Sequence, residues 1–256
     1  MNESFQFENY TVEIDRRAFF KGLRLEFSGD LQLRITTAKQ TPYAPIVRFL
    51  HEKKTWIEKQ RLKRCRKNKT IEELRSRYGF RDGQYVPILG HERKVQHVPS
   101  PFHLHFCSIA EDSIRFHFPM FQANETLSDD SKKCEAFVTC FNRESERYLS
   151  SEVKRLAAQT HLHPRRFGFR NQSTRWGSCS SQGALSLNRK LYCLSPSAIE
   201  YVIIHELCHL QHLNHSQNFW DLVEKHCPIY KTSEKELKHS HLKIDYFFGL
   251  LSKSSD

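Results

Sequence analysis

His205-Glu206-Leu207-Cys208-His209 is the stretch of this sequence that decides its fold, and His215 follows it after five residues. On an α-helix, residues four apart lie about 40° apart around the axis and about 6 Å apart along it, so the first and last histidines project side by side. Glu206 lies next to the first of them, where its carboxylate can contact a water on a bound ion without binding the ion itself. The spacing therefore predicts a helix that carries two imidazole ligands for zinc and a general base.

Two further histidines are candidates for the third ligand. His212 follows His205 by seven residues, about 10 Å further along one helix, so a straight helix cannot bring His205, His209 and His212 to the same ion. His215 would point roughly 120° away if the helix continued. It becomes available if the helix ends near Asn214, because Asn tolerates the left-handed cap conformation. We therefore predict His205, His209 and His215 as the ligands.

The predicted ligand set favours a catalytic zinc site over a structural one. Structural zinc sites are closed, usually with four protein ligands and with cysteine prominent. Here three histidines and a glutamate outside the ligand set leave a coordination position open. A nucleic-acid-associated module in which zinc only holds the fold remains as an alternative.

The composition is that of a basic protein long enough to bury a full core. The chain has 256 residues, with 40 Lys and Arg against 29 Asp and Glu, a formal net charge of +11 and a pI near 9.3. Its length allows one large domain or two small ones. Its charge favours acidic partners such as nucleic acid, phosphorylated ligands or anionic surfaces, without identifying one of them.

Three features indicate a reduced, soluble environment. The first 17 residues carry acidic groups and no apolar run, unlike a signal peptide. No stretch is as long as a membrane-spanning helix, so we expect no membrane partner. The eight cysteines include no C-x-x-C pair and are typical of free thiols. We therefore expect a cytoplasmic protein.

The first half of the chain predicts a β-rich subdomain over residues 1–125. Residues 5–38 alternate apolar and polar side chains in short runs around a turn at Gly29, which is typical of antiparallel hairpins. Apolar residues at helical spacing then predict a basic helix over 45–69. The dense basic run 59–69 is either a surface for nucleic acid or another polyanion, or a solvated helix face. Aromatic residues that would stack on bases are missing from it.

The second half predicts a separate α+β domain over residues 126–256. Polar turn residues over 122–132 mark the boundary. Four elements are expected after it: a long amphipathic helix over 133–160, strands over 167–171 and 184–188, and the motif helix, which Ser195-Pro196 opens with an N-cap hydroxyl and a first-turn proline.

Together these residues resemble the YgjP-like metallopeptidase-domain family, which is more distantly similar to the SprT/Spartan-like and WLM zinc proteases. The resemblance rests on five segments: Arg-Trp-Gly-Ser-Cys-Ser at 175–180, Leu187-Asn188, Tyr201–His212, Asn214-His215-Ser216 and Phe219-Trp220. It implies a zincin-like catalytic domain with an active-site helix and a small sheet. It also implies a zinc ion on His205, His209 and His215, with Glu206 as the base.

The expected function is therefore that of a zinc-dependent hydrolase. A metallopeptidase that uses a zinc-bound water activated by Glu206 is the favoured form. A metal-dependent nucleoside triphosphate pyrophosphatase is the alternative, because the resemblance leaves peptide and nucleotide substrates open and a zinc site does not distinguish an amide from a phosphoanhydride.

Two further segments are expected to contact the substrate. Arg175 is a candidate partner for an oxyanion or a phosphate, and the other interpretation is a structural arginine that ties its loop to a carboxylate. The strand Ala184–Asn188 is expected to lie beside the motif helix with an exposed edge, where an extended peptide can add to the sheet.

Overall fold

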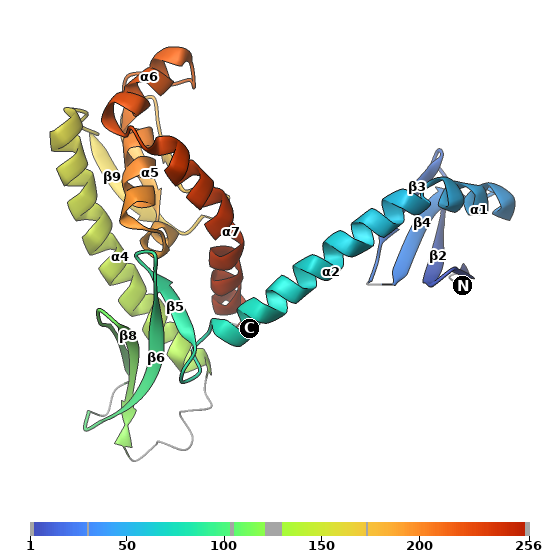
Figure 1. The fold of residues 1–256 in the computed structure, drawn as a ribbon, viewed down its shortest axis with the longest axis horizontal. Coiled ribbons are helices and arrows are strands. Elements are labelled where there is room, and N and C mark those ends of the chain that lie inside the picture. The colour runs from blue at the N-terminus through green and yellow to red at the C-terminus, as the bar shows by residue number, and fades with distance from the viewer. Residues whose placement is uncertain (1–2, 30, 103–104, 121–129, 173, 254–256) are drawn as a thin grey trace. The chain divides into compact units, whose positions relative to one another are not determined.

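The computed structural model describes residues 3–29, 31–102, 105–120, 130–172 and 174–253 of the chain. They form a mixed α+β structure of helices and small sheets (Figure 1), as expected for the fold class. The chain separates into two compact units, residues 1–73 and residues 74–256. Each unit buries its own hydrophobic cluster, and no residue belongs to both clusters.

The N-terminal unit is a four-stranded sheet covered by helical residues. Its strands are β1 (Glu3–Phe7), β2 (Tyr10–Arg17), β3 (Leu23–Phe27) and β4 (Gln32–Ala38), in the order β1-β2-β4-β3. Its core joins Val12, Leu33 and Ile35 of the sheet to Ile46 and Leu50 of helix α1 (Tyr43–Glu52).

One strand pairing in this sheet differs from the antiparallel hairpins predicted for residues 5–38. The pairs β1–β2 and β3–β4 are antiparallel, but β2 and β4 are parallel. The reason is the position of β3, which forms a hairpin with β4 through the turn near Gly29 and does not pair with β2. Strand β4 is thereby inserted beside β2 in the same direction, which a pattern of alternating residues cannot indicate.

The predicted basic helix 45–69 is two helices, α1 and α2 (Lys54–Arg77). Helix α1 ends at Glu52 with Lys53 as its C-cap, and α2 continues eight residues beyond the predicted end at 69. Within α2, Ile57 is the buried residue and packs into the core of the N-terminal unit. The remaining residues of α2 are polar on nearly all sides, which is typical of a helix surrounded by solvent.

The C-terminal unit begins with a second four-stranded sheet. Its strands are β5 (Tyr85–Ile88), β6 (His91–Ser100), β7 (Phe106–Ile109) and β8 (Ser113–Pro119), in the order β5-β6-β8-β7. The sheet packs on α4 (Asp130–Thr160), which confirms the predicted helix 133–160. Phe80 stands 5.1 Å from Phe137 of α4 and 5.6 Å from Phe247, measured between ring centroids.

This packing places the division between the two units elsewhere than the predicted domains 1–125 and 126–256. Residues 78–118 share one hydrophobic cluster with the helices that follow them, so the division falls after residue 73. The polar segment 122–132 marks a connection within the second unit, and its residues 122–129 lie outside the described part of the chain. Polarity indicates a loop, but it does not show which core the flanking strands join.

A three-stranded sheet and the motif helix complete the C-terminal unit. The sheet contains β9 (Arg166–Arg170), β10 (Gly177–Cys179) and β11 (Ala184–Asn188), in the order β10-β11-β9. Strands β9 and β11 match the two predicted strands, and β10 is an additional strand that lies between them in the sequence. The helical elements that follow are η2 (Arg189–Cys193), α5 (Pro196–Cys208), α6 (Gln217–His226) and α7 (Tyr230–Lys253).

Helix α5 is held at its start by contacts from three directions. The Ser195 hydroxyl accepts a hydrogen bond from the Ala198 amide at 3.2 Å, which confirms the predicted N-cap, and donates to Glu236 of α7 at 2.7 Å. Gly90, in the β5–β6 turn, packs so closely that an added Cβ would lie 2.9 Å from Cα of Ser195. In Figure 1, α4 and α7 flank α5, and both contact it. The motif helix is therefore fixed in position before it reaches its first histidine.

Among the helices of the described residues, none is both long enough and apolar enough to cross a membrane.

Candidate metal centre

The motif helix ends at the second histidine, earlier than predicted. Helix α5 stops at Cys208, and His209 is its C-cap residue, with φ −65° and ψ −13°. A backbone-bonded turn follows, in which the amides of Leu210 and His212 donate to the carbonyls of Leu207 and Cys208, each at 3.0 Å. The helix therefore ends six residues before the expected end near Asn214, which is more than one and a half turns. His215 can nevertheless approach the other two histidines, as predicted, because the chain turns back before residue 215.

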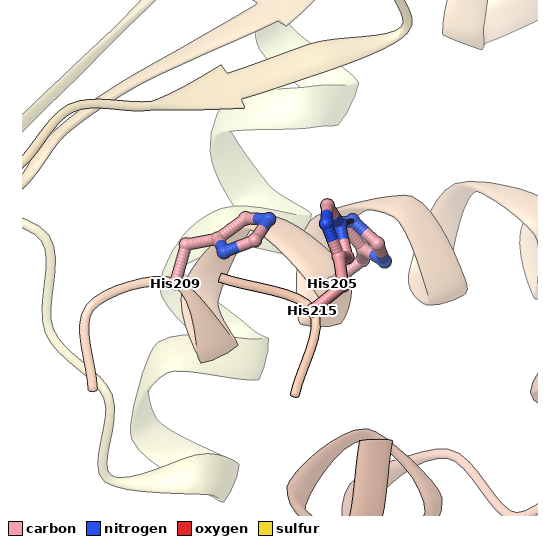
Figure 2. Close-up of side chains that lie close together, drawn as sticks. All are labelled: His205, His209 and His215. Carbon is pink, nitrogen blue, oxygen red and sulfur yellow. Dashed lines mark hydrogen bonds between the residues drawn. The ribbon is translucent and has the colours of Figure 1, made fainter. Parts of the chain in front are cut away.

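The three predicted ligands lie together (Figure 2). Nε2 of His205 and Nε2 of His215 are 3.1 Å apart, and the candidate ligand atoms of His205, His209 and His215 all lie within 4.8 Å of one another. A tetrahedral zinc ion with Zn–N bonds of about 2.0–2.1 Å separates its ligand nitrogens by roughly 3.3 Å. The separation of the first pair is close to this value, and no pair of candidate ligand atoms in the cluster is more than 4.8 Å apart.

The hydrogen bond of His209 explains the place of His212 in the site. Nδ1 of His209 lies 2.9 Å from the carbonyl oxygen of His212, so Nδ1 carries the proton and donates to that carbonyl. The lone pair of His209 is then on Nε2, the atom available to a metal. His212 therefore contributes its backbone carbonyl to the site, and its imidazole is not part of the cluster.

The electrostatics of the cluster favour neutral imidazoles. Burial, reinforced by the neighbouring His209 and His215, lowers the pKa of His205 to about 4. Burial also lowers the pKa of His209. Because metal ligands must be deprotonated, the lowered pKa values of His205 and His209 let these two imidazoles bind a cation near pH 7 without first losing protons.

One phenylalanine contacts all three imidazoles, although the sequence indicated it only as part of a segment that resembles the family. Phe219 of α6 is fully buried, and its ring centroid lies 4.9 Å from that of His205, 4.5 Å from that of His209 and 4.8 Å from that of His215. It closes one side of the cluster with an apolar surface and limits the rotation of the rings. The i, i+4 spacing of Phe219 from His215 was the available signal.

Glu206 is buried beside the cluster without a hydrogen-bond partner among the described residues. The residue is 7% exposed, and burial raises the pKa of its carboxyl to about 7, an effect that the positive charge of Arg175 opposes. A carboxyl group with such a pKa can take up and release a proton near neutral pH. From the sheet, Gly177 lies so close to Glu206 that an added Cβ would be 2.8 Å from Cγ of Glu206.

Arg175 lies within electrostatic range of Glu206 on the loop before β10. Its carbonyl oxygen accepts a hydrogen bond from Nδ2 of Asn188 at 2.8 Å. Its side chain is exposed and forms no ion pair or hydrogen bond within the described residues. The alternative interpretation of Arg175, a structural arginine tied to a carboxylate, therefore has no supporting contact.

The strand expected to offer a free edge is not at an edge. β11 is the central strand, paired with β10 on one side and with β9 on the other. β10 is the edge strand next to the motif helix, and α5 contacts it. The expectation of a free edge on Ala184–Asn188 was wrong because the short strand β10, only Gly177–Cys179, pairs with β11.

Comparison with known proteins agrees with the resemblance of the sequence. The YgjP-like metallopeptidase-domain family matches residues 21–240, and the chain belongs to this family. Among solved structures, the metallopeptidase zymogen abylysin of Pyrococcus abyssi is similar at 22% identity, over 36% of this chain and 93% of that chain, with a TM-score of 0.34. No curated protein matches the chain. The family match therefore carries the assignment to a metallopeptidase class, which implies a metal-dependent hydrolase.

Proposed function

We propose that this chain is a zinc-dependent metallopeptidase with a zincin-like catalytic domain. His205, His209 and His215 would hold the zinc ion, and Glu206 would be the general base. The observation that carries the proposal is the cluster of three imidazoles around the end of α5, together with the buried carboxyl group of Glu206, which follows His205 in the same helix. The family to which the chain belongs supports the same class of reaction.

The donor set fits zinc in a catalytic site. Three imidazoles provide the borderline-soft nitrogen ligands that zinc prefers, and the described residues supply no fourth His, Cys, Asp or Glu to this cluster. Structural zinc sites are usually closed by a fourth ligand, often a cysteine. Cys208 lies within the motif but outside the cluster, which disfavours a zinc site with only a structural role.

Three residues of the chain would have separate roles in hydrolysis. When bound, zinc supplies Lewis acidity, which acidifies a water and polarises the bond under attack. Glu206 accepts the proton of the attacking water and passes it to the leaving group. The free guanidinium of Arg175 would stabilise negative charge that develops on the substrate oxygen. Phe219 keeps bulk water away from one side of the imidazoles.

Two features favour a peptide over a nucleotide as the substrate. The outer edge of β10 presents backbone groups beside α5, and an extended peptide can hydrogen-bond to such an edge as an additional strand. A nucleoside triphosphate requires several cations for its phosphates. In the described structure, Arg175 is the cation whose charge acts on Glu206, and a single cation is fewer than a triphosphate requires.

A substrate screen tests the proposal. Zinc-loaded full-length protein is incubated with casein, with a peptide mixture and with nucleoside triphosphates, and the Glu206→Gln variant serves as the blank. Cleavage of protein or peptide that the variant lacks is the expected result. Hydrolysis of triphosphates alone would instead favour the pyrophosphatase. No turnover of any substrate class by the zinc-loaded protein would reject the hydrolase.

A second surface, on α2, supports a polyanion partner. With Ile57 facing the core of the N-terminal unit, helical geometry places Lys59, Lys63 and Arg66 within about 60° of one another on the opposite face. None of these three side chains has a carboxylate partner among the described residues. We propose that this stripe contacts the phosphates of a nucleic acid, and the absence of aromatic residues in it favours backbone contacts over base stacking.

Neutralising this stripe should weaken the salt dependence of nucleic-acid binding. Each lost phosphate contact lowers the slope of log K against log salt concentration by about 0.7–0.9, so changing the three residues of the stripe and the neighbouring Lys67 to Gln should lower it by about 3–4. The matched control changes Lys154, Lys225, Lys231 and Lys235, which are exposed in the C-terminal unit. Equal slopes for the two variants would mean that the stripe is only a solvated face.

A further inference from the structure

We propose that Gly177 is a positioning residue for the general base, because its missing side chain forms the space in which the Glu206 carboxylate lies. The catalytic consequence of this inference rests on the proposed function, whereas the contact itself does not. Three observations support it: the distance between the two residues, the backbone conformation of Gly177, and the hydrogen bonds that hold β10 in place.

The distance leaves no room for a methyl group. A Cβ added at Gly177 would lie 2.8 Å from Cγ, 3.0 Å from Cδ and 2.9 Å from Oε1 of Glu206. Carbon atoms in ordinary contact are about 3.5–4.0 Å apart. Cγ is only two bonds from the backbone of α5, so rotating the carboxylate alone cannot relieve the overlap. The whole side chain of Glu206 would have to adopt another rotamer.

The backbone of Gly177 does not itself require glycine. Gly177 lies in a regular antiparallel pair with Leu187, and its φ is outside the left-handed region, where glycine is favoured. The requirement therefore comes from its neighbour Glu206. Gly168 provides the contrast within the same sheet, since a Cβ added there would meet no atom within 4 Å.

Asn188 prevents β10 from moving away from Glu206. Its Nδ2 donates to the carbonyl oxygens of Gln172 and Arg175, both at 2.8 Å, and its backbone amide donates to the carbonyl of Trp176, also at 2.8 Å. Its Oδ1 accepts from the amide of Lys190 at 3.1 Å. Asn188 is 2% exposed, so breaking these bonds would leave buried polar groups without partners. The loop that leads into Gly177 is thereby fixed.

The test is a double-mutant cycle that compares Gly177→Ala with Gly168→Ala. In the wild-type background, Gly177→Ala should lower the thermal midpoint of the full chain by about 3–10 °C, the usual effect of overpacking, and Gly168→Ala should change it much less. In a Glu206→Ala background the overlapping atoms are gone. In that background, Gly177→Ala should lower the thermal midpoint by no more than Gly168→Ala lowers it in the wild type.

The kinetic arm uses the substrate found by the screen. Gly177→Ala should retain zinc and lower kcat by about 10²-fold, since a displacement of about 1 Å of a reacting group has that effect. It should cause no further loss in a Glu206→Gln background, because the displaced base is already inactive. Gly168→Ala should keep wild-type kcat and KM.

Each outcome decides the matter. Equal destabilisation by Gly177→Ala with and without the Glu206 side chain would overturn the inference, as would failure of both the single and the double variant to fold. Folding of the double variant alone would support it. If the wild type hydrolyses no substrate, the proposed function fails while the stability cycle still decides the contact between Gly177 and Glu206.

Discussion

Replacing Glu206 by glutamine should lower kcat by about 10²–10⁴-fold, the usual cost of removing a general base, without loss of zinc. Glutamine has nearly the same volume as glutamate and can still form a hydrogen bond to the attacking water. It cannot accept the proton. The role assigned to Glu206 is proton transfer and not coordination, so the zinc content of the variant should equal that of the wild type.

The stability of the Glu206→Gln variant gives an independent measurement. The carboxyl group of Glu206 is buried, and its pKa is raised to about 7. Above that pH the metal-free wild type must keep a buried charge, and glutamine removes this cost. The thermal midpoint of the metal-free variant at pH 8 should therefore equal or exceed that of the wild type. Glu224→Gln, an exposed change on α6, is the matched control and should alter neither rate nor stability.

Two results would contradict this role for Glu206. Loss of zinc from the Glu206→Gln variant would make the residue a ligand or an element of the fold. Full activity with zinc retained would mean that another group takes the proton.

Removing any one of the three histidines should abolish tight zinc binding. His205→Ala, His209→Ala and His215→Ala each leave two imidazoles in a site that offers no fourth protein ligand within the described residues. Loss of only a group that hydrogen-bonds to a ligand typically costs about 10–100-fold in metal affinity. We therefore expect each of these ligand variants to lose at least about 10²-fold in affinity, and hydrolysis to fall to background. Zinc content by elemental analysis and competition with a chelator measure this effect.

His212→Ala is the control for the histidine series. His212 contributes its carbonyl oxygen to Nδ1 of His209, and alanine retains a carbonyl, so this variant should keep its zinc. Zinc retention by His215→Ala together with zinc loss by His212→Ala would show that the ligand set is wrongly assigned. Loss of zinc from every variant including His212→Ala would indicate instead that the turn itself had collapsed.

The motif helix and its ligands were predictable because their geometry is local. The four-residue spacing of His205 and His209 fixes two ligands on any helix, and the incompatibility of His212 with that helix left His215. The Ser195-Pro196 start and the helix over 133–160 were equally local, since caps and helical periodicity are written into consecutive residues.

Other features depend on contacts that no local pattern encodes. β10 has three residues, too few to show alternation, so its role as the edge strand was invisible. The parallel pairing of β2 with β4 and the sharing of one core by β5–β8 and α4 are consequences of long-range packing. The role of Gly177 depends on the close approach of the Glu206 side chain, which is also a long-range contact.

The position of His215 depends on the number of residues in the turn that follows His209 far more than on which residues these are. This turn is held by backbone hydrogen bonds at residues 207–212 and by the carbonyl that receives the proton of His209. Leu213 within it is 65% exposed. Substitutions on its surface would leave the imidazoles in place, whereas one inserted or deleted residue would shift the register of His215 against the helix. We therefore expect the protein to tolerate changes of the exposed residues in this segment, but not changes in the number of residues between His209 and His215.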